Sequence, residues 1–290
     1  MQNFNFHQHT YRCGHADFNF SDEDYVIESI SQGLKTICFT DHAPNRIDKR
    51  KRMRMSYDEK DDYLASIEKL KDKYRDMIDI YAGYEVEYTK DNEEELKKFK
   101  KESDILILGQ HFILCNGEVK VANYEKYTDE DMDNYAQTIE EALSLGIIDI
   151  LAHPDFVMLA REDFKSKDEE IANRILQAAE KYNVPVEINL NKIFAKTYFD
   201  YKNRKLKDYK NPEEYLENLQ KIKYPCKKFW DIATNYNVKV LYGIDTHFKG
   251  QISLFNELVY LANKAIGEDT IKKLNFCNLE DIIKTKNKVR

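Results

Sequence analysis

The sequence predicts an α/β fold in which parallel strands alternate with helices. Short apolar segments and amphipathic segments follow one another for most of the 290 residues. The apolar segments lack the polar–apolar alternation of a half-exposed strand, so they suit a parallel sheet that is buried on both faces. About seven strand–helix units, with candidate ligands where the strands end, are typical of a (β/α) barrel whose active site lies at the carboxyl ends of its strands.

The amino-terminal half contains the clearest boundaries between elements. Ser21 and Asp24 form a capping box for a first helix that should end near Gly33, and Ser56 and Glu59 form a second one. Behind the second box, apolar residues recur at helical spacing as far as Tyr74. The predicted strands of this half are Phe4–Phe6, Lys35–Phe39, Ile78–Val86 and Ile105–Leu108.

The carboxyl-terminal half continues the alternation. A helix should begin at Thr128–Asp131 and end at Gly146. Further helices are predicted at Ile171–Tyr182 and Phe229–Tyr236, and strands at Ile147–Ala152, Val184–Leu190 and Val238–Tyr242. The polar region Phe194–Tyr224 is interpreted as a long loop with some helix near Pro212–Ile222.

Composition limits the class of protein. The chain is 42% hydrophobic and 33% charged, and its net charge of −7 gives no general attraction to nucleic acid or anionic membranes. Five scattered cysteines without a CxxC pair suit a reduced, cytoplasmic location. We expect no signal peptide and no membrane span. Few prolines and glycines leave no obvious linker, so residues 1–290 are expected to form a single domain.

The seven histidines are the most informative residues. They are His7, His9, His15, His42, His111, His153 and His247, and nearly all lie in or just beyond a predicted strand. His7 and His9 are two apart on one strand, which places both side chains on one face roughly 6.6–7 Å apart. A lone histidine at such a place is more often structural. Seven converging imidazoles would repel one another when protonated, so the set favours a multinuclear metal site.

Several short motifs around these histidines resemble one known family. They are His7-Gln8-His9-Thr10, Thr40-Asp41-His42-Ala43-Pro44, Gly83-Tyr84-Glu85-Val86-Glu87-Tyr88, Leu108-Gly109-Gln110-His111-Phe112-Ile113, His153-Pro154-Asp155 and Gly243-Ile244-Asp245-Thr246-His247. From Phe6 to about His247 the chain resembles the PHP-domain phosphoesterases, and within them the histidinol-phosphatase type. Two motifs depart from the usual family pattern, Cys13-Gly14-His15-Ala16 and the Gly243–His247 segment, but both keep the expected ligands.

The resemblance implies a distorted (β/α)7 TIM-like barrel, the PHP fold, that holds two to three divalent ions (Zn, Mn or Fe) at the carboxyl ends of its strands. One metal would be held by His7, His9, Glu85 and Asp245. Glu85 would bridge to a second metal, which His111 and His153 complete. His15, His42 and His247 would hold the third. Glu85 is preferred to Glu87 because it directly follows Gly-x, and Glu187 is a minor candidate for a ligand.

The resemblance also implies an activity. The chain would be a metal-dependent phosphomonoesterase that hydrolyses L-histidinol phosphate to L-histidinol by attack of a metal-activated hydroxide, with Glu85, Asp245 and His247 as catalytic residues. Other small phosphate esters, nucleotides or nucleic-acid ends are alternative substrates, and a non-catalytic metal-binding regulator is a remote alternative. Cys13 is interpreted as a packing residue rather than a nucleophile.

A phosphate ester should also meet a cationic side chain. Arg161, eight residues beyond His153, is the first candidate, and Arg54 is the second. Arg54 ends the basic run Lys49–Arg54, which could attract nucleic acid but is more often a solvated face. The expected partner is therefore a small-molecule phosphate ester. Neither a membrane nor nucleic acid is favoured, and the oligomeric state stays open.

Overall fold

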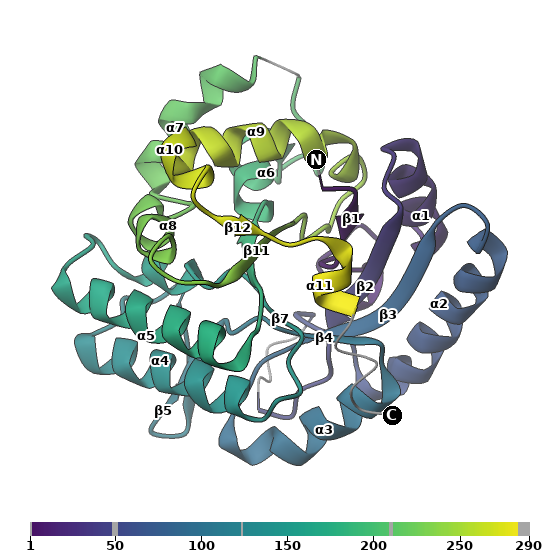
Figure 1. Cartoon of the computed structure of the whole chain (residues 1–290). Helices are drawn as coiled ribbons and strands as arrows, with labels where there is room; N and C mark the ends of the chain where they lie inside the picture. The colour runs from purple at the N-terminus through teal and green to yellow at the C-terminus, as the bar shows by residue number, and fades with distance from the viewer. Residues whose placement is uncertain (1, 48–51, 123, 209–210, 284–290) are drawn as a thin grey trace.

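A parallel sheet of eight strands forms the centre of the molecule (Figure 1). This computed structural model describes residues 2–47, 52–122, 124–208 and 211–283. In spatial order the strands are β1 (Phe4–Asn5), β2 (Thr36–His42), β3 (Asp79–Val86), β4 (Ile105–Leu108), β7 (Ile150–Leu151), β8 (Val186–Asn189), β11 (Lys239–Gly243) and β12 (Asn275–Phe276). All neighbouring pairs are parallel. The predicted fold class is therefore confirmed.

Backbone hydrogen bonds just beyond β1 and β11 bring the two sides of the sheet together. Gln8 and Thr246 form an isolated parallel bridge, and the amide of His9 donates to the carbonyl of Thr246 at 2.9 Å. The amide of Asp245 donates to the carbonyl of His7, also at 2.9 Å. Because these contacts follow the two strands, the sheet curves toward a barrel at its carboxyl edge, where the candidate ligands lie.

The described helices lie mostly on the outside of the sheet, whereas α11 (Leu279–Ile283) packs against the core cluster inside it (Figure 1). The others are α1 (Asp22–Ser31), α2 (Lys60–Tyr74), α3 (Glu93–Glu102), α4 (Asp129–Ser144), α5 (Ser166–Tyr182), α6 (Asn191–Thr197), α7 (Leu216–Ile222), α8 (Lys227–Ala233), α9 (Phe255–Ile266) and α10 (Glu268–Ile271). Two short hairpins, β5–β6 (Phe112–Cys115, Glu118–Val121) and β9–β10 (Phe199–Asp200, Lys205–Leu206), complete the described elements. None of the described helices is long and apolar enough to cross a membrane.

Strand β4 shows why the apolar segments did not alternate. Ile105 and Ile107 belong to a core cluster inside the sheet, together with Phe4, Phe6 and Leu241. Their neighbours on the same strand, Leu106 and Leu108, pack into the larger cluster between the sheet and the helices. Both faces are buried, so both need apolar side chains.

Both predicted capping boxes are confirmed, and the helix predicted to begin at Thr128–Asp131 begins with a third. The amide of Asp24 donates to the Ser21 hydroxyl at 3.2 Å, and the amide of Asp131 donates to the Thr128 hydroxyl at the same distance. At the second predicted box a 3-10 turn of Tyr57–Glu59 precedes α2, which begins at Lys60. Helix also forms near Pro212–Ile222 as predicted.

Other elements differ from the expectation. Helix α3 was missed because only Leu96 and Phe99 are buried in a highly charged segment. The β5–β6 hairpin was missed too, although its Asn116-Gly117 turn, with both residues at positive φ, is a typical hairpin signal. Helix α9 and strand β12 follow His247, beyond the last predicted element, and the supposed loop after Phe194 contains hairpin β9–β10.

Candidate metal centre

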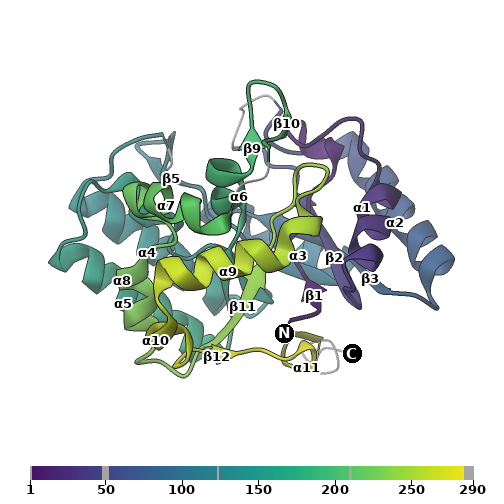
Figure 2. The same cartoon turned by 90° about the horizontal axis from the view of Figure 1, so that it is seen from above.

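The candidate ligands lie at the carboxyl ends of the strands, as predicted. His7, His9 and His15 follow β1, His42 ends β2 and Glu85 lies near the end of β3. The other candidate ligands follow β4, β7 and β11. Figure 2 shows hairpin β9–β10 projecting at one end of the molecule, with both termini at the opposite end. The imidazole rings lie close together, with centroids 4.2 Å apart for His9–His247, 4.3 Å for His9–His42, 4.6 Å for His15–His247 and 4.7 Å for His111–His153.

Glu85 lies at the centre of this cluster. Its carboxylate is 1% exposed, and its oxygens lie 2.8 Å from His42 Nδ1 and 3.0 Å from His153 Nε2. The remaining contacts with imidazole nitrogens are to His9 at 3.4 Å, His7 at 3.5 Å and His111 at 3.7 Å. Burial alone would raise the pKa of Glu85, but the surrounding imidazolium charges outweigh burial and hold the pKa well below its ordinary value.

Asp245 is the second carboxylate that contacts several histidines. Its Oδ1 lies 3.1 Å from His9 Nε2, 3.2 Å from His247 Nδ1 and 3.6 Å from His7 Nε2. Asp245 and His153 both have positive φ, 51° and 33°, a conformation that costs about 1–3 kcal/mol for such residues. Backbone strain of this kind clusters at functional sites, where the surrounding structure holds it in place.

An outer set of polar groups orients the histidines. His7 Nδ1 lies 2.8 Å from Glu187, His9 Nδ1 3.4 Å from Asp41, His111 Nδ1 3.1 Å from Glu87, and His15 Nδ1 3.1 Å from the carbonyl of Cys13. Metal-binding histidines commonly use their second nitrogen in this way. Glu187 and Glu87 therefore each contact one candidate ligand from outside the histidine cluster. Glu85 lies inside the cluster and is the better placed of the three glutamates to bind a metal.

The donor atoms in the cluster fit divalent cations. Among the described residues, several buried atoms that face the centre have no hydrogen-bond partner: His7 Nε2, His9 Nε2, His42 Nδ1, Glu85 Oε2 and Asp245 Oδ1. The Nε2 atoms of His15 and His247 face each other at 2.8 Å. Leaving so many buried polar atoms unsatisfied is costly, and a bound cation would satisfy them together.

The pKa values of neighbouring imidazoles also differ strongly. Burial lowers the pKa of His42 to about 4. Burial also acts against the charged form of His9, but the neighbouring carboxylates of Asp245 and Asp41 raise its pKa to about 9. Packed this closely, the rings cannot all carry a proton, and the neutral rings offer lone pairs to a metal.

Triads of donor atoms within 4.8 Å of one another overlap the three predicted metal groups. Three of these triads are His7, His9 and Glu85; His42, Glu85 and His111; and Cys13, His15 and His247. His42 thus belongs with Glu85 and His111, and a further triad joins it to His9 and His247. Its expected assignment to the third metal alone is not reflected in these distances. Cys13 is buried beside the cluster, and burial raises its thiol pKa well above its ordinary value, which does not suit a nucleophile.

The two predicted phosphate-binding arginines have different surroundings. Arg54 lines the pocket over the histidines, where its guanidinium contacts Glu87 at 2.7 and 3.3 Å. Arg161 lines a separate pocket, and its guanidinium is bound by Asp168 at 2.9 Å, Asp129 at 2.6 Å and the carbonyl of Tyr127 at 2.7 Å. These acceptors hold Arg161 outside the lining of the histidine pocket, so its role in binding phosphate stays a prediction. Of the basic run Lys49–Arg54, residues 48–51 lie outside the described part of the chain.

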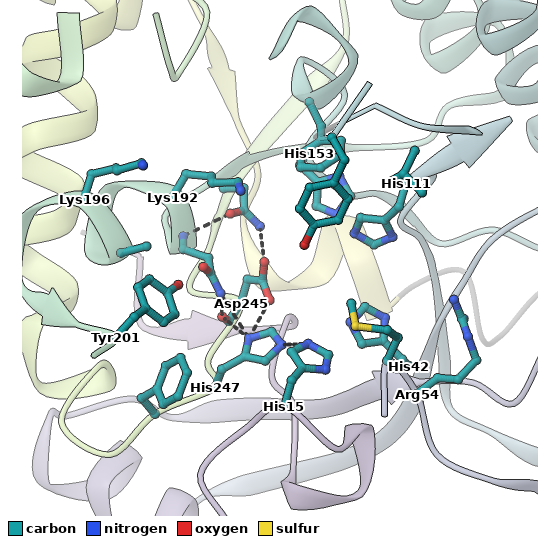
Figure 3. Close-up of a pocket in the computed structure, with 18 of the residues that line it drawn as sticks. His15, His42, Arg54, His111, His153, Lys192, Lys196, Tyr201, Asp245 and His247 are labelled. Atoms are coloured by element: carbon teal, nitrogen blue, oxygen red, sulfur yellow. Dashed lines mark hydrogen bonds and ion pairs between the residues drawn. The ribbon is translucent and has the colours of Figure 1, made fainter. Parts of the chain in front are cut away.

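The pocket itself has a volume of about 500 Å³ (Figure 3). Besides the histidines and Arg54, its walls include Phe156, Lys192, Tyr201 and Phe248. Sequence reasoning did not identify Lys192, which opens α6 just after β8. Its place directly after a strand was the available signal, the same one that identified the histidines.

The comparisons with known proteins agree with this class of site, a histidine-rich metal centre on a parallel α/β sheet. The sequence profile of the PHP domain matches residues 5–191, so the chain belongs to the PHP domain family. Two curated relatives are a protein named probable histidinol-phosphatase of Deinococcus radiodurans, 25% identical over 51% of this chain, and histidinol-phosphatase of Bacillus subtilis, 28% identical over 48%. The matches span only 59% and 55% of those relatives.

Two solved structures share the fold. A candidate histidinol phosphatase from Listeria monocytogenes has a TM-score of 0.67 and 17% identity, over 86% of this chain and 97% of the other. Histidinol phosphate phosphatase from Lactococcus lactis, solved with zinc, L-histidinol and phosphate, has a TM-score of 0.63 and 18% identity, over 91% and 94%.

Gly109 should be essential for placing Glu85. A Cβ atom at this position would lie 1.7 Å from Glu85 Oε1, so Gly109→Ala must displace the carboxylate. We expect the variant to lose bound metal, as measured by elemental analysis after purification without chelator. Gly33→Ala is the matched control, because nothing lies within 4 Å of its Cβ, although its φ of +84° should cost about 1–2 kcal/mol of stability. Full metal content in Gly109→Ala would contradict this role.

Proposed function

We propose that the chain is a metal-dependent phosphomonoesterase with a centre of up to three divalent ions. The observation that carries this proposal is the buried Glu85 carboxylate, which contacts five imidazoles and lies among several buried polar atoms without a hydrogen-bond partner. His7, His9, Glu85 and Asp245 would hold one ion, and Glu85, His111 and His153 a second. His15 and His247 would hold the third, with His42 within reach of both neighbouring groups.

When bound, such ions lower the pKa of a water molecule and neutralise the charge of a phosphate group. The side chains of this chain have supporting roles. Glu187 and Asp41 orient His7 and His9, and the ion pair of Arg54 with Glu87 fixes the second nitrogen of His111. The walls of the pocket confine the ester and exclude bulk water. Asp245 and His247 line the pocket, and we assign to them the transfer of a proton in the reaction.

L-Histidinol phosphate, which would yield L-histidinol and phosphate, is the proposed substrate. Support comes from the histidinol-phosphatase relatives and from the aromatic pocket walls, on which an imidazole could pack. Other small phosphate esters are the alternative. A regulatory protein without activity is less well supported, because every expected ligand position is filled. A single domain over the whole chain and a cytoplasmic location remain predictions.

Metal content tests the centre directly. We expect roughly two to three divalent ions per chain, which a chelator or acid should remove because protonated imidazoles cannot bind metal. Elemental analysis should follow separate reconstitution with zinc, manganese and iron. Less than one equivalent after every reconstitution would refute the centre.

Glu85 and Glu87 provide a matched pair for the bridging role. Glu85→Gln should lower kcat by at least ~10²-fold, because it removes the charge shared by two cations. Glu87→Gln should cost much less, since Glu87 contacts only one ligand, His111. Steady-state kinetics on protein of checked folding and metal content would measure both, and equal modest losses would mean that Glu85 is not the bridge.

Substrate preference tests the finer part of the proposal. If histidinol phosphate is the substrate, its kcat/KM should exceed that of p-nitrophenyl phosphate by ~10²-fold or more, because contacts to the leaving group add to those of the phosphate. The two esters are compared on the same metal-loaded protein. A flat profile would transfer the function to another phosphate ester and leave the metal centre in place.

A further inference from the structure

One wall of the pocket is rich in cationic side chains. Lys192 and Lys196 lie on α6, and Arg204 lies in the turn between β9 and β10, so all three come from the segment that follows β8. In Figure 3, Lys192 and Lys196 are on the side of the pocket away from Arg54, and Lys192 is drawn between Lys196 and His153. This wall is defined here as the cationic wall.

Two carboxylates line the pocket, and both have other partners. They are Glu87, which pairs with Arg54 and His111, and Asp245, which contacts the histidines. Among the described residues, no carboxylate forms an ion pair with Lys196 or Arg204. The chain as a whole carries a net charge of −7, so the positive charge of this wall is a local feature.

Two cations of the wall are close enough in the chain to repel each other. Lys192 and Lys196 are four residues apart on one helix, which places their side chains on the same face. Burial lowers the pKa of Lys192 below its ordinary value, and the like charge of Lys196 lowers it further against the opposing effect of Asp245. A bound anion would relieve this repulsion and compensate for the lost hydration.

The wall lies further out than the metal centre. Lys196 and Arg204 are exposed, whereas His7, His9 and Glu85 are buried. A phosphate held on the histidine side of the pocket would direct its ester group outward, toward Lys192 and the rim. The cationic wall would then face the leaving group rather than the phosphate being cleaved.

We propose that Lys192, Lys196 and Arg204 form a second anion subsite, and that the chain hydrolyses phosphate monoesters whose leaving group carries a further carboxylate or phosphate. Such esters are the alternative to histidinol phosphate, because the leaving group of histidinol phosphate carries an ammonium. The inference rests on the proposed phosphomonoesterase function. In the reaction, water adds to phosphorus, the P–O bond to the leaving group breaks, and the leaving oxygen takes up a proton. The products are inorganic phosphate and an anionic alcohol.

A matched pair of esters tests the subsite by activity. 3-Phosphoglycerate and glycerol 3-phosphate differ mainly in a carboxylate that replaces a hydroxymethyl group. On the metal-loaded protein we expect kcat/KM to be at least ~10-fold higher for 3-phosphoglycerate, the contribution of a charge-assisted contact. The double variant Lys196→Gln/Arg204→Gln should bring this ratio close to one. The control Lys202→Gln/Lys205→Gln removes the same charge from the same segment, outside the pocket lining, and should keep the ratio.

A matched pair of phosphonates tests the subsite without turnover. 3-Phosphonopropionate carries a carboxylate where propylphosphonate carries a methyl group, and neither is hydrolysed. Calorimetry should give a Kd at least ~10-fold lower for the former, with the difference lost in Lys196→Gln/Arg204→Gln. Equal Kd values in the unmodified protein would overturn the inference. So would an equal weakening of both phosphonates by the double variant, because the cations would then bind the phosphate itself. Absence of hydrolysis with the Kd difference intact would instead reject only the phosphatase function.

Discussion

The burial of one carboxylate among imidazoles is the constraint on which the rest of the site depends. Glu85 is almost inaccessible to water, and an isolated charge in such a place would be very costly. Its oxygens are compensated by five histidines from the ends of four strands, β1, β2, β4 and β7, so these strands must end at the same level. Gly109 leaves the space that the carboxylate fills. The burial of Glu85 therefore requires that the fold bring these strand ends together, so the fold and the candidate metal centre depend on each other.

Backbone contacts between the segments that follow β1 and β11 also bring candidate ligands together, at the other side of the sheet. The amide of Asp245 binds the carbonyl of His7, which fixes a carboxylate from near the end of the fold beside two histidines from its beginning. The positive φ of Asp245 shows that the backbone accepts strain to reach this position. Glu187, buried between these strands, then orients His7. Glu187 is thus a second buried carboxylate, and it contacts the candidate ligand His7 without being a proposed ligand itself.

The sequence predicted the parts of the structure that depend on local patterns. Strand β4 was predicted with its observed bounds, because a four-residue apolar segment buried on both faces has an unambiguous composition. The histidine cluster followed from ligand types at strand ends. Arg161 could not be placed in this way, because its environment depends on Asp168 and Asp129, acceptors that only the packing of α4 and α5 brings to it. Helix α3 was missed for a related reason, since its short buried face gives too little periodicity.

The two halves of the pocket therefore differ in how they are determined. On one side, the candidate metal ligands lie at strand ends. A parallel sheet places these ends together, whatever the length of the connections between strands. The opposite wall is formed by residues 191–206, a short helix and a hairpin that lie mostly in the region after Phe194 that was predicted as a long loop. Side chains on such a connection can change without moving the strands. We therefore propose that the family motifs supply the chemistry in this chain, and that the cationic segment supplies the preference for a substrate.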